Sequence, residues 1–148
     1  MYDPLKRIAE TVDRLYRSVC FRKGERPDTQ GLHEIFLAGG RLINCDEEPP
    51  AVMTLEGFIR EMERQMAGGT VGELHEKEIA HRTDLFGRVA QRFSTYEARF
   101  DWNAKEPFAV GINSIQLIET GGAWKVASLV WNNETDVLKI PAVYLRGR

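Results

Sequence analysis

The chain has 148 residues, of which 43% are hydrophobic and 28% are charged, and its formal net charge is −2. These values are typical of a globular protein and exclude a disordered chain, and the length suits a single domain spanning residues 1–148. Basic and acidic residues are interleaved without a basic stripe, which excludes a typical nucleic-acid-binding surface. No apolar run approaches the ~18 residues that span a bilayer, and the N-terminus lacks an apolar signal core. We therefore expect no membrane span and a cytoplasmic location.

The first half of the sequence predicts helices. From Pro4 to about Arg22, apolar residues recur every three or four positions, which indicates an amphipathic helix with Asp3 as its N-cap. A second such pattern runs from Thr54, a capping residue, to about Ala67, where a glycine pair follows. Between these helices we expect a short helix, a short strand and a loop, over Asp28–Leu37, Arg41–Cys45 and Asp46–Pro50 respectively.

The second half predicts a sheet. Four long extended stretches are separated by short gaps, which is typical of successive hairpins. They cover Glu73–Leu85, Arg88–Trp102, Val110–Glu119 and Trp124–Asn132. Lys139–Leu145 is expected either to add an edge strand or to wrap around the domain as a tail. Helices followed by strands indicate the α+β class, with a curved antiparallel sheet wrapped around the N-terminal helices and a cavity between the layers. Strands of this length need one or more β-bulges to curve.

Several motifs resemble the nuclear transport factor 2-like superfamily, the cone-shaped α+β barrels with a cystatin-like fold that include ketosteroid isomerase-like and SnoaL-like proteins. The resemblance covers nearly the whole chain and is stronger to bacterial branches than to any named enzyme. It rests on the two main helices and on three further stretches, Gly87–Glu97, Gly111–Leu117 and the hairpin region from Trp124 to Trp131. It implies a cone that admits a small, mostly apolar molecule and a homodimer formed through the outer sheet face. Members include isomerases, cyclases, dehydratases, epoxide hydrolases and non-catalytic binding proteins, so the resemblance leaves the function open.

Two strands carry polar residues that are candidates for the cavity wall. Alternation along Arg88–Trp102 places Arg92 and Tyr96 on one face among small residues. If that face lines the cone, Arg92 meets an anionic ligand group and Tyr96 donates a hydrogen bond; otherwise Arg92 is solvated and Tyr96 packs at the rim. Asn113 and Ser114 face opposite sides of the next strand, so at most one faces the cavity. A buried Asn113 is either a pocket group or a structural hydrogen-bonding group.

The helices contribute further candidates. Tyr16 flanks the apolar stripe of the first helix and faces either the cavity or the core, and His33 and Phe36 lie in the short helical region. The predicted ligand-binding residues are therefore Tyr16, His33, Phe36, Arg92, Tyr96 and Asn113.

An enzyme with this fold needs a carboxyl or imidazole group inside an apolar cavity, where burial tunes its pKa. The candidates are Asp84, Asp101 and His33. Because the sequence contains no recognisable catalytic set, the catalytic residues stay unassigned and the chain is left undecided between enzyme and binding protein.

Metal and cofactor sites are not expected. On a regular strand, His75 and His81 face the same way but lie about 20 Å apart, too far to share one ion, so the nearby Glu76 and Glu78 do not complete a metal site. The glycine pairs of the chain lie at turns and do not form a phosphate-binding loop, so no cofactor is implied.

The remaining cysteine and tryptophan residues are expected to be structural. Cys20 and Cys45 are far apart in the sequence and are expected to be small buried or half-buried thiols. Trp124 and Trp131 are expected on opposite faces of their strand, one in the core and one on the dimer surface.

Three functions therefore remain open. The leading hypothesis is a homodimeric protein that binds an unknown small, largely apolar molecule in the cavity, without demonstrated catalysis. The alternative is an isomerase, dehydratase or hydrolase that acts on a small hydrophobic substrate by general acid–base chemistry. The third is a protein-interaction module whose cavity is filled by its own side chains.

Overall fold

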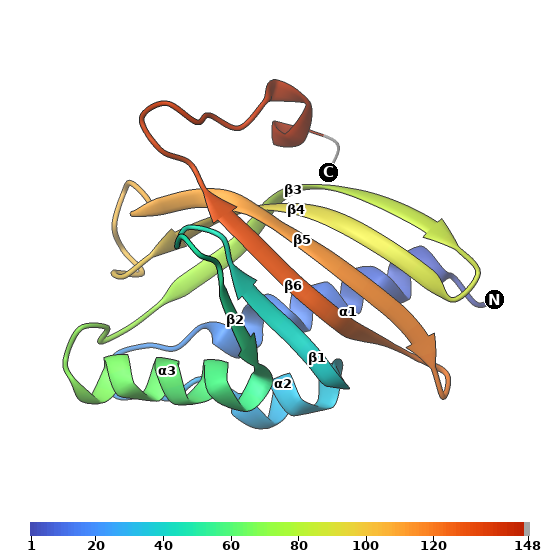
Figure 1. Cartoon of the computed structure of the whole chain (residues 1–148), viewed down its shortest axis with the longest axis horizontal. Coiled ribbons are helices and arrows are strands. Elements are labelled where there is room, and N and C mark those ends of the chain that lie inside the picture. The colour runs from blue at the N-terminus through green and yellow to red at the C-terminus, as the bar shows by residue number, and fades with distance from the viewer. Residues whose placement is uncertain (147–148) are drawn as a thin grey trace.

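The computed structural model describes residues 1–146 and contains three helices and one six-stranded sheet (Figure 1). In chain order the elements are α1 (Pro4–Val19), α2 (Thr29–Ile35), β1 (Phe36–Asn44), β2 (Ala51–Thr54), α3 (Leu55–Ala67), β3 (His75–Phe86), β4 (Val89–Arg99), β5 (Ala109–Thr120), β6 (Ala123–Asn133) and the 3₁₀ turn η1 (Ala142–Leu145). Within the described residues, no helix combines the length and the apolar character that crossing a membrane demands.

The helices begin where their capping residues predict. The Asp3 side chain accepts a hydrogen bond from the backbone N–H of Lys6, and Pro4 occupies the first turn of α1. The Thr54 hydroxyl accepts from the backbone N–H of Gly57 at 3.0 Å and caps α3. Both main helices are confirmed, and α1 ends at Val19, three residues before the predicted end.

The sheet has the strand order β2-β1-β6-β5-β4-β3, and β3 to β6 form the predicted antiparallel meander. One expectation was wrong, since the sheet is not antiparallel throughout. β1 runs parallel to β6, and β2, a strand that the sequence did not predict, pairs antiparallel with β1. A parallel neighbour requires a crossover, and here the chain crosses from β1 through β2 and α3 to reach the meander. The sheet is open, with β2 and β3 as its edges.

The sheet curves around α1, which crosses its concave face, while the C-terminal segment lies on the opposite side (Figure 1). We call the concave side the inner face and the other side the outer face. One apolar cluster fills the middle of the inner face, and its fully buried members include Ile8, Val12, Leu32, Ile115 and Leu117. The centre of the inner face is therefore packed by these side chains.

A β-bulge at Ile79 reverses the alternation of β3. The register pairs Glu78 with Tyr96 but Ala80 with Thr95, so one extra residue stands between them. The register places His81, opposite the buried Ser94, on the inner face. His75, the first residue of β3, precedes the inward-facing Glu76 and lies on the other side of the strand, at the edge of the cavity between α1 and β3. The expectation that the two histidines face the same way was wrong because it assumed a regular strand.

A second irregularity lies in β6 and corrects the expectation for the tryptophans. The register shifts between the pairs Gln116–Ser128 and Leu117–Val126, which leaves Ala127 as the extra residue. Trp124 is buried, and Trp131 packs on the same core cluster with its ring 6.2 Å from that of Phe58. Both indoles therefore point inward, and neither forms the outer surface.

The C-terminal segment takes the second of its two predicted forms, a tail. It crosses the outer face and ends in η1, where the Thr95 hydroxyl donates to the backbone carbonyl of Tyr144 at 2.6 Å. The Tyr144 ring lies 5.3 Å from the ring of Phe93, which is still 40% exposed. The tail thus covers part of the outer face over β4.

Candidate functional site

A cavity of about 670 Å³ lies between α1 and the edge strand β3. Its interior is lined by Tyr16 of α1, by Cys20 at the C-cap of α1, and by Glu76 and Glu78 of β3. Trp102 of the β4–β5 connection stands at its mouth. Volumes of this size hold small organic ligands. The cavity therefore combines a helix face with two carboxyl groups of one strand.

The local sequence explains why both carboxyl groups point inward. Before the bulge β3 is regular, so residues two apart share a face. Glu76 lies opposite Ala98 and Glu78 opposite Tyr96, and both partners are buried inner-face residues of β4. The small Ala98 side chain leaves room beside Glu76.

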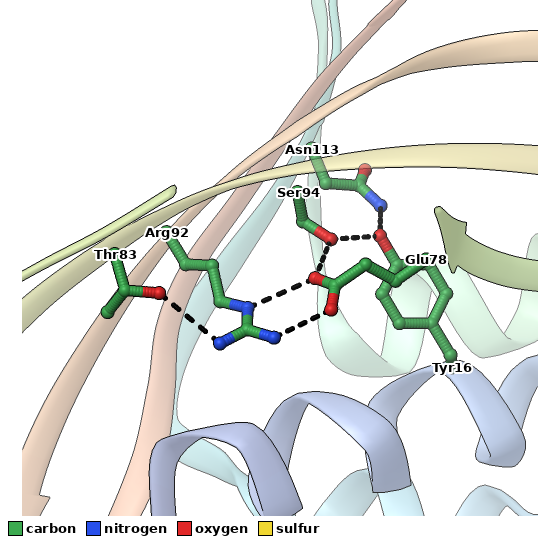
Figure 2. A network of polar contacts seen from close by, with 6 residues as sticks. All are labelled: Tyr16, Glu78, Thr83, Arg92, Ser94 and Asn113. Atoms are coloured by element: carbon green, nitrogen blue, oxygen red, sulfur yellow. Dashed lines mark hydrogen bonds and ion pairs between the residues drawn. The ribbon is translucent and has the colours of Figure 1, made fainter. Parts of the chain in front are cut away.

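Glu78 is held by a guanidinium group. Arg92 Nη2 donates to Glu78 Oε1 at 2.6 Å and Arg92 Nε donates to Oε2 at 3.0 Å, and both side chains are largely buried (Figure 2). Arg92 Nη1 donates to the Thr83 hydroxyl at 3.2 Å. This bidentate geometry is the strongest form of a carboxylate ion pair, so Glu78 anchors Arg92 rather than a ligand.

A directional chain of hydrogen bonds reaches Glu78 from the other side (Figure 2). Ser94 Oγ donates to Glu78 Oε2 at 2.5 Å, which uses the only proton of that hydroxyl. The Tyr16 hydroxyl, 2.6 Å from Ser94 Oγ, must therefore be the donor in that contact. Asn113 Nδ2 donates in turn to the Tyr16 oxygen at 3.0 Å. Because its proton is committed to Ser94, Tyr16 positions the network and does not donate to the cavity.

Glu76 has a different environment. It is partly buried, and within residues 1–146 no lysine, arginine or histidine forms an ion pair with it. Burial raises the pKa of Glu76 to about 7, although a hydrogen bond from the Asn113 side chain offsets part of the effect. A carboxyl group that titrates near neutral pH and lines a cavity can give or take a proton there.

Cys20 forms part of the cavity wall beside Glu76. Its sulfur lies 3.2 Å from the backbone carbonyls of Tyr16 and Glu76 and accepts from the Glu76 backbone N–H at 3.3 Å. Burial raises the pKa of the Cys20 thiol, which keeps it protonated and weakly nucleophilic. It therefore contributes shape rather than reactivity. Cys45 is exposed, so the expectation that it is buried or half-buried was wrong.

A stack of side chains fixes Trp102 at the mouth. The Trp102 indole N–H donates to the Phe21 carbonyl at 3.0 Å, and the Arg22 guanidinium lies 4.1 Å from the ring centroid. The His75 ring lies 4.3 Å from the same indole. Burial, followed by the charges of Lys77 and Arg99, lowers the pKa of His75, which favours its neutral form.

The structure brings three of the six predicted ligand-binding residues into one network. Tyr16 lines the cavity, and Arg92 and Asn113 are buried behind its wall, where each is bonded to other side chains. For Arg92, neither predicted environment holds, since it is buried and paired with Glu78 rather than facing a ligand or water.

The other three predicted residues lie elsewhere. Tyr96 is buried and its hydroxyl donates to Asn133 Oδ1. The hydroxyl packs directly on Gly111, since a Cβ atom at that residue would lie 2.5 Å from it. Phe36 belongs to the core cluster. His33 is exposed on α2 and reaches no described cavity. Tyr96, Phe36 and His33 therefore do not line the cavity between α1 and β3.

The predicted acid–base candidates are also on the surface. Asp84, Asp101 and His33 are all exposed, so none has the buried setting that the enzyme hypothesis required of them. Glu76 and Glu78 are the carboxyl groups that line the cavity, and the sequence indicated them only as neighbours of two histidines. The Glu-Lys-Glu spacing of residues 76–78 indicates that two carboxyl groups share a face of a strand. Which face is inward could not be read from that spacing alone. Within residues 1–146, no group of three His, Cys, Asp or Glu side chains has a metal-binding arrangement.

A second, smaller pocket of about 290 Å³ lies on the outer face under the C-terminal tail. Phe93, Ile112 and Val130 of the sheet form one wall, and Leu138 and Ile140 of the tail form the other. Ser114 lines this pocket while Asn113 points inward, as the alternation of β5 predicted.

Comparisons with known proteins relate the chain to solved structures. No protein-family model and no curated protein matches it. It is similar to a Nostoc punctiforme protein of unknown function with a cystatin-like fold, with a TM-score of 0.71 and 12% identity over 89% of this chain and 92% of that one. It is also similar to an NTF2-like protein of unknown function from Pseudomonas putida, with a TM-score of 0.68 and 12% identity over 95% and 96%. A third neighbour, a Novosphingobium aromaticivorans protein provisionally named scytalone dehydratase, has a TM-score of 0.68 and 11% identity over 89% and 85%.

Proposed function

We propose that this chain, which has the nuclear transport factor 2-like fold of these neighbours, binds a small molecule in the cavity between α1 and β3. The observation that carries the proposal is Glu76, a carboxyl group without a cationic partner among the described residues, placed on the wall of a cavity of about 670 Å³. Leaving a carboxyl group partly buried and unpaired costs free energy, which is tolerated where the group serves a ligand. The lining combines polar and charged side chains with apolar surface from Ala9 and the Trp102 indole, which suits a small ligand that carries both an apolar part and a polar group.

This proposal is favoured over the interaction module with a filled cone. A filled cone needs a cavity too small for a few heavy atoms, whereas this cavity has the volume of a small-ligand site. Because the core cluster fills the centre of the inner face, the proposed site lies beside the edge strand β3.

A cavity-filling variant tests the proposal. Ala9 of α1 is half-buried and lines the cavity, so Ala9→Phe fills the space without removing a polar group. A library of small aromatic amines, alcohols, ketones and carboxylates is screened by thermal shift against both proteins. We expect at least one compound to stabilise the parent protein and not Ala9→Phe. If no compound stabilises the parent, or if Ala9→Phe responds equally, the cavity is not the binding site.

The second candidate is an enzyme that uses Glu76 as a general acid–base. Two observations favour it: the pKa of Glu76, raised by burial to about 7, and the neighbour provisionally named scytalone dehydratase. Deuterium exchange into small cyclic ketones, followed by proton NMR, tests this function. We expect Glu76→Gln to abolish exchange and Glu25→Gln, at the exposed mouth, to retain it. Exchange that survives in Glu76→Gln contradicts this role.

The outer face supports the homodimer that the resemblance implies. Phe93 is 40% exposed beside an apolar pocket formed by the sheet and the tail, and a second copy of the chain would cover it. Sedimentation equilibrium is expected to give a dimer for the parent protein and a monomer for Phe93→Asp. A monomeric parent protein at micromolar concentration contradicts the dimer.

A further inference from the structure

Two carboxyl groups of β3 line the cavity, and only one of them has a cationic partner among residues 1–146. Glu78 accepts two hydrogen bonds from Arg92, which neutralises it within the wall. Glu76 lines the same inner wall and receives hydrogen bonding from the neutral Asn113 amide alone, so its charge has no local counterion among residues 1–146.

The cations that line the cavity are committed to other partners at its mouth. Arg17 pairs with Asp13 at 2.8 Å, and Lys77 lies 3.5 Å from Glu97. The guanidinium group of Arg22 stacks on the Trp102 indole. None of these cations forms an ion pair with Glu76, so an ionised Glu76 leaves this part of the cavity negative.

The groups that face Glu76 from the neighbouring elements are neutral or already paired. From α1 and its C-cap these are Tyr16 and Cys20, whose pKa values burial raises, so both stay uncharged at neutral pH. From β4 the group is Tyr96, whose pKa is raised in the same way, and from β3 it is Glu78, paired with Arg92. A positive charge beside Glu76 must therefore come from a ligand.

We infer that the ligand of this cavity is an organic cation, a protonated amine on an apolar body, whose ammonium group pairs with Glu76. This inference rests on the proposed binding function of the cavity and adds the chemical class of its ligand. An ammonium group replaces the missing counterion, and Ala9 and the Trp102 indole offer apolar surface to the body of the ligand. A carboxylate ligand is disfavoured because it would place a like charge beside Glu76.

Benzylamine, benzyl alcohol and benzoate test the inference, because they share one apolar body and differ in charge. Isothermal titration calorimetry with each compound is carried out at pH 6 and pH 8. With the pKa of Glu76 at about 7, its ionised fraction rises about tenfold over this range, so benzylamine is expected to bind about tenfold more tightly at pH 8. Benzyl alcohol and benzoate are expected to bind more weakly than benzylamine at pH 8.

Two glutamine variants complete the test. Glu76→Gln is expected to weaken benzylamine binding at least tenfold and to remove its pH dependence. Glu25→Gln, which removes an exposed carboxylate at the mouth, is expected to change the affinity by less than about twofold. If Glu76→Gln does not fold, the pH dependence of the parent protein still decides the question.

The outcomes separate this inference from the proposed function. If benzyl alcohol or benzoate binds and Ala9→Phe abolishes that binding, while benzylamine shows no advantage, the cavity binds ligands but the cationic class is wrong. If benzylamine binds equally at both pH values, the pairing with Glu76 is wrong. If none of the three compounds binds while another compound of the library stabilises the parent protein and not Ala9→Phe, the inference fails and the proposed function stands.

Discussion

Glu76 and Glu78 lie two residues apart on the same face of β3, but only Glu78 is paired with a cation among the described residues. The pairing follows from position, since Arg92 lies on the adjacent strand within reach of Glu78 and not of Glu76. One carboxyl group thus stabilises the wall of the cavity, and the other is available to a ligand or a proton.

Glu76→Gln is expected to change the pH dependence of stability. The pKa of Glu76 lies at about 7 in the folded protein, above its ordinary value of 4.5, so protonation favours folding. This contribution is complete below pH 4.5 and is lost as the pH rises through 7, by at most about 3 kcal/mol. Urea unfolding at several pH values should show the parent losing stability relative to Glu76→Gln between pH 5 and pH 8. Parallel curves for the two proteins would contradict the raised pKa.

Arg92→Leu is expected to be strongly destabilising. It leaves the largely buried Glu78 carboxylate without its counterion, and removing one partner of a buried pair costs about 3–5 kcal/mol. The double variant Arg92→Leu/Glu78→Leu should recover much of this loss, because no unpaired charge remains. Urea unfolding measures both changes. A double variant less stable than Arg92→Leu would show that the cost arises from packing.

Tyr16→Phe is expected to reduce the free energy of unfolding by about 1–3 kcal/mol, since it leaves the buried Asn113 amide and Ser94 hydroxyl short of a partner. Tyr2→Phe is the matched control. Tyr2 is exposed and its hydroxyl accepts one hydrogen bond, from the Trp124 indole at 2.9 Å, so the loss there should be smaller. Equal losses at both positions would mean that the buried network adds nothing.

The two cysteines are expected to react at different rates with iodoacetamide. Cys45 is exposed, whereas Cys20 is half-buried and burial raises the pKa of its thiol. Mass spectrometry of Cys45→Ser and Cys20→Ser should show slower alkylation at Cys20. A ligand bound in the cavity should slow the alkylation of Cys20 further and leave the alkylation rate of Cys45 unchanged. Similar alkylation rates for both thiols would contradict the prediction and would show that the cavity wall opens readily.

The sequence was informative wherever a strand is regular. On β4 the alternation of residues correctly placed Arg92 and Tyr96 on one face, which the structure shows to be buried, and on β5 it separated Asn113 from Ser114. The helix starts at Pro4 and after Thr54 followed from side-chain caps that act locally. Local chemistry decides these features, so a single sequence suffices to predict them.

The errors have non-local causes. The bulges at Ile79 and Ala127 arise from sheet curvature, and each reversed the predicted side of the residues beyond it, His81 and Trp131 respectively. The parallel pairing of β1 with β6 joins segments more than eighty residues apart. Asp84 and Asp101 were chosen as candidate acids from their places near strand ends, whereas the burial of Glu76 depends on α1 lying across the inner face of β3.

The extra residue in β3 has a practical consequence for anyone transferring positions between this chain and others of similar shape. Before Ile79, the even-numbered residues Glu76 and Glu78 face inward. After Ile79, the odd-numbered residues, such as His81, face inward instead. When this chain is aligned with one that lacks the bulge, a gap must be placed opposite Ile79. Without that gap, inward-facing residues on one side of Ile79 would be matched to outward-facing residues of the other chain. Equivalent residues must therefore be matched separately before and after this point, by their neighbours on β4 rather than by their distance along the sequence.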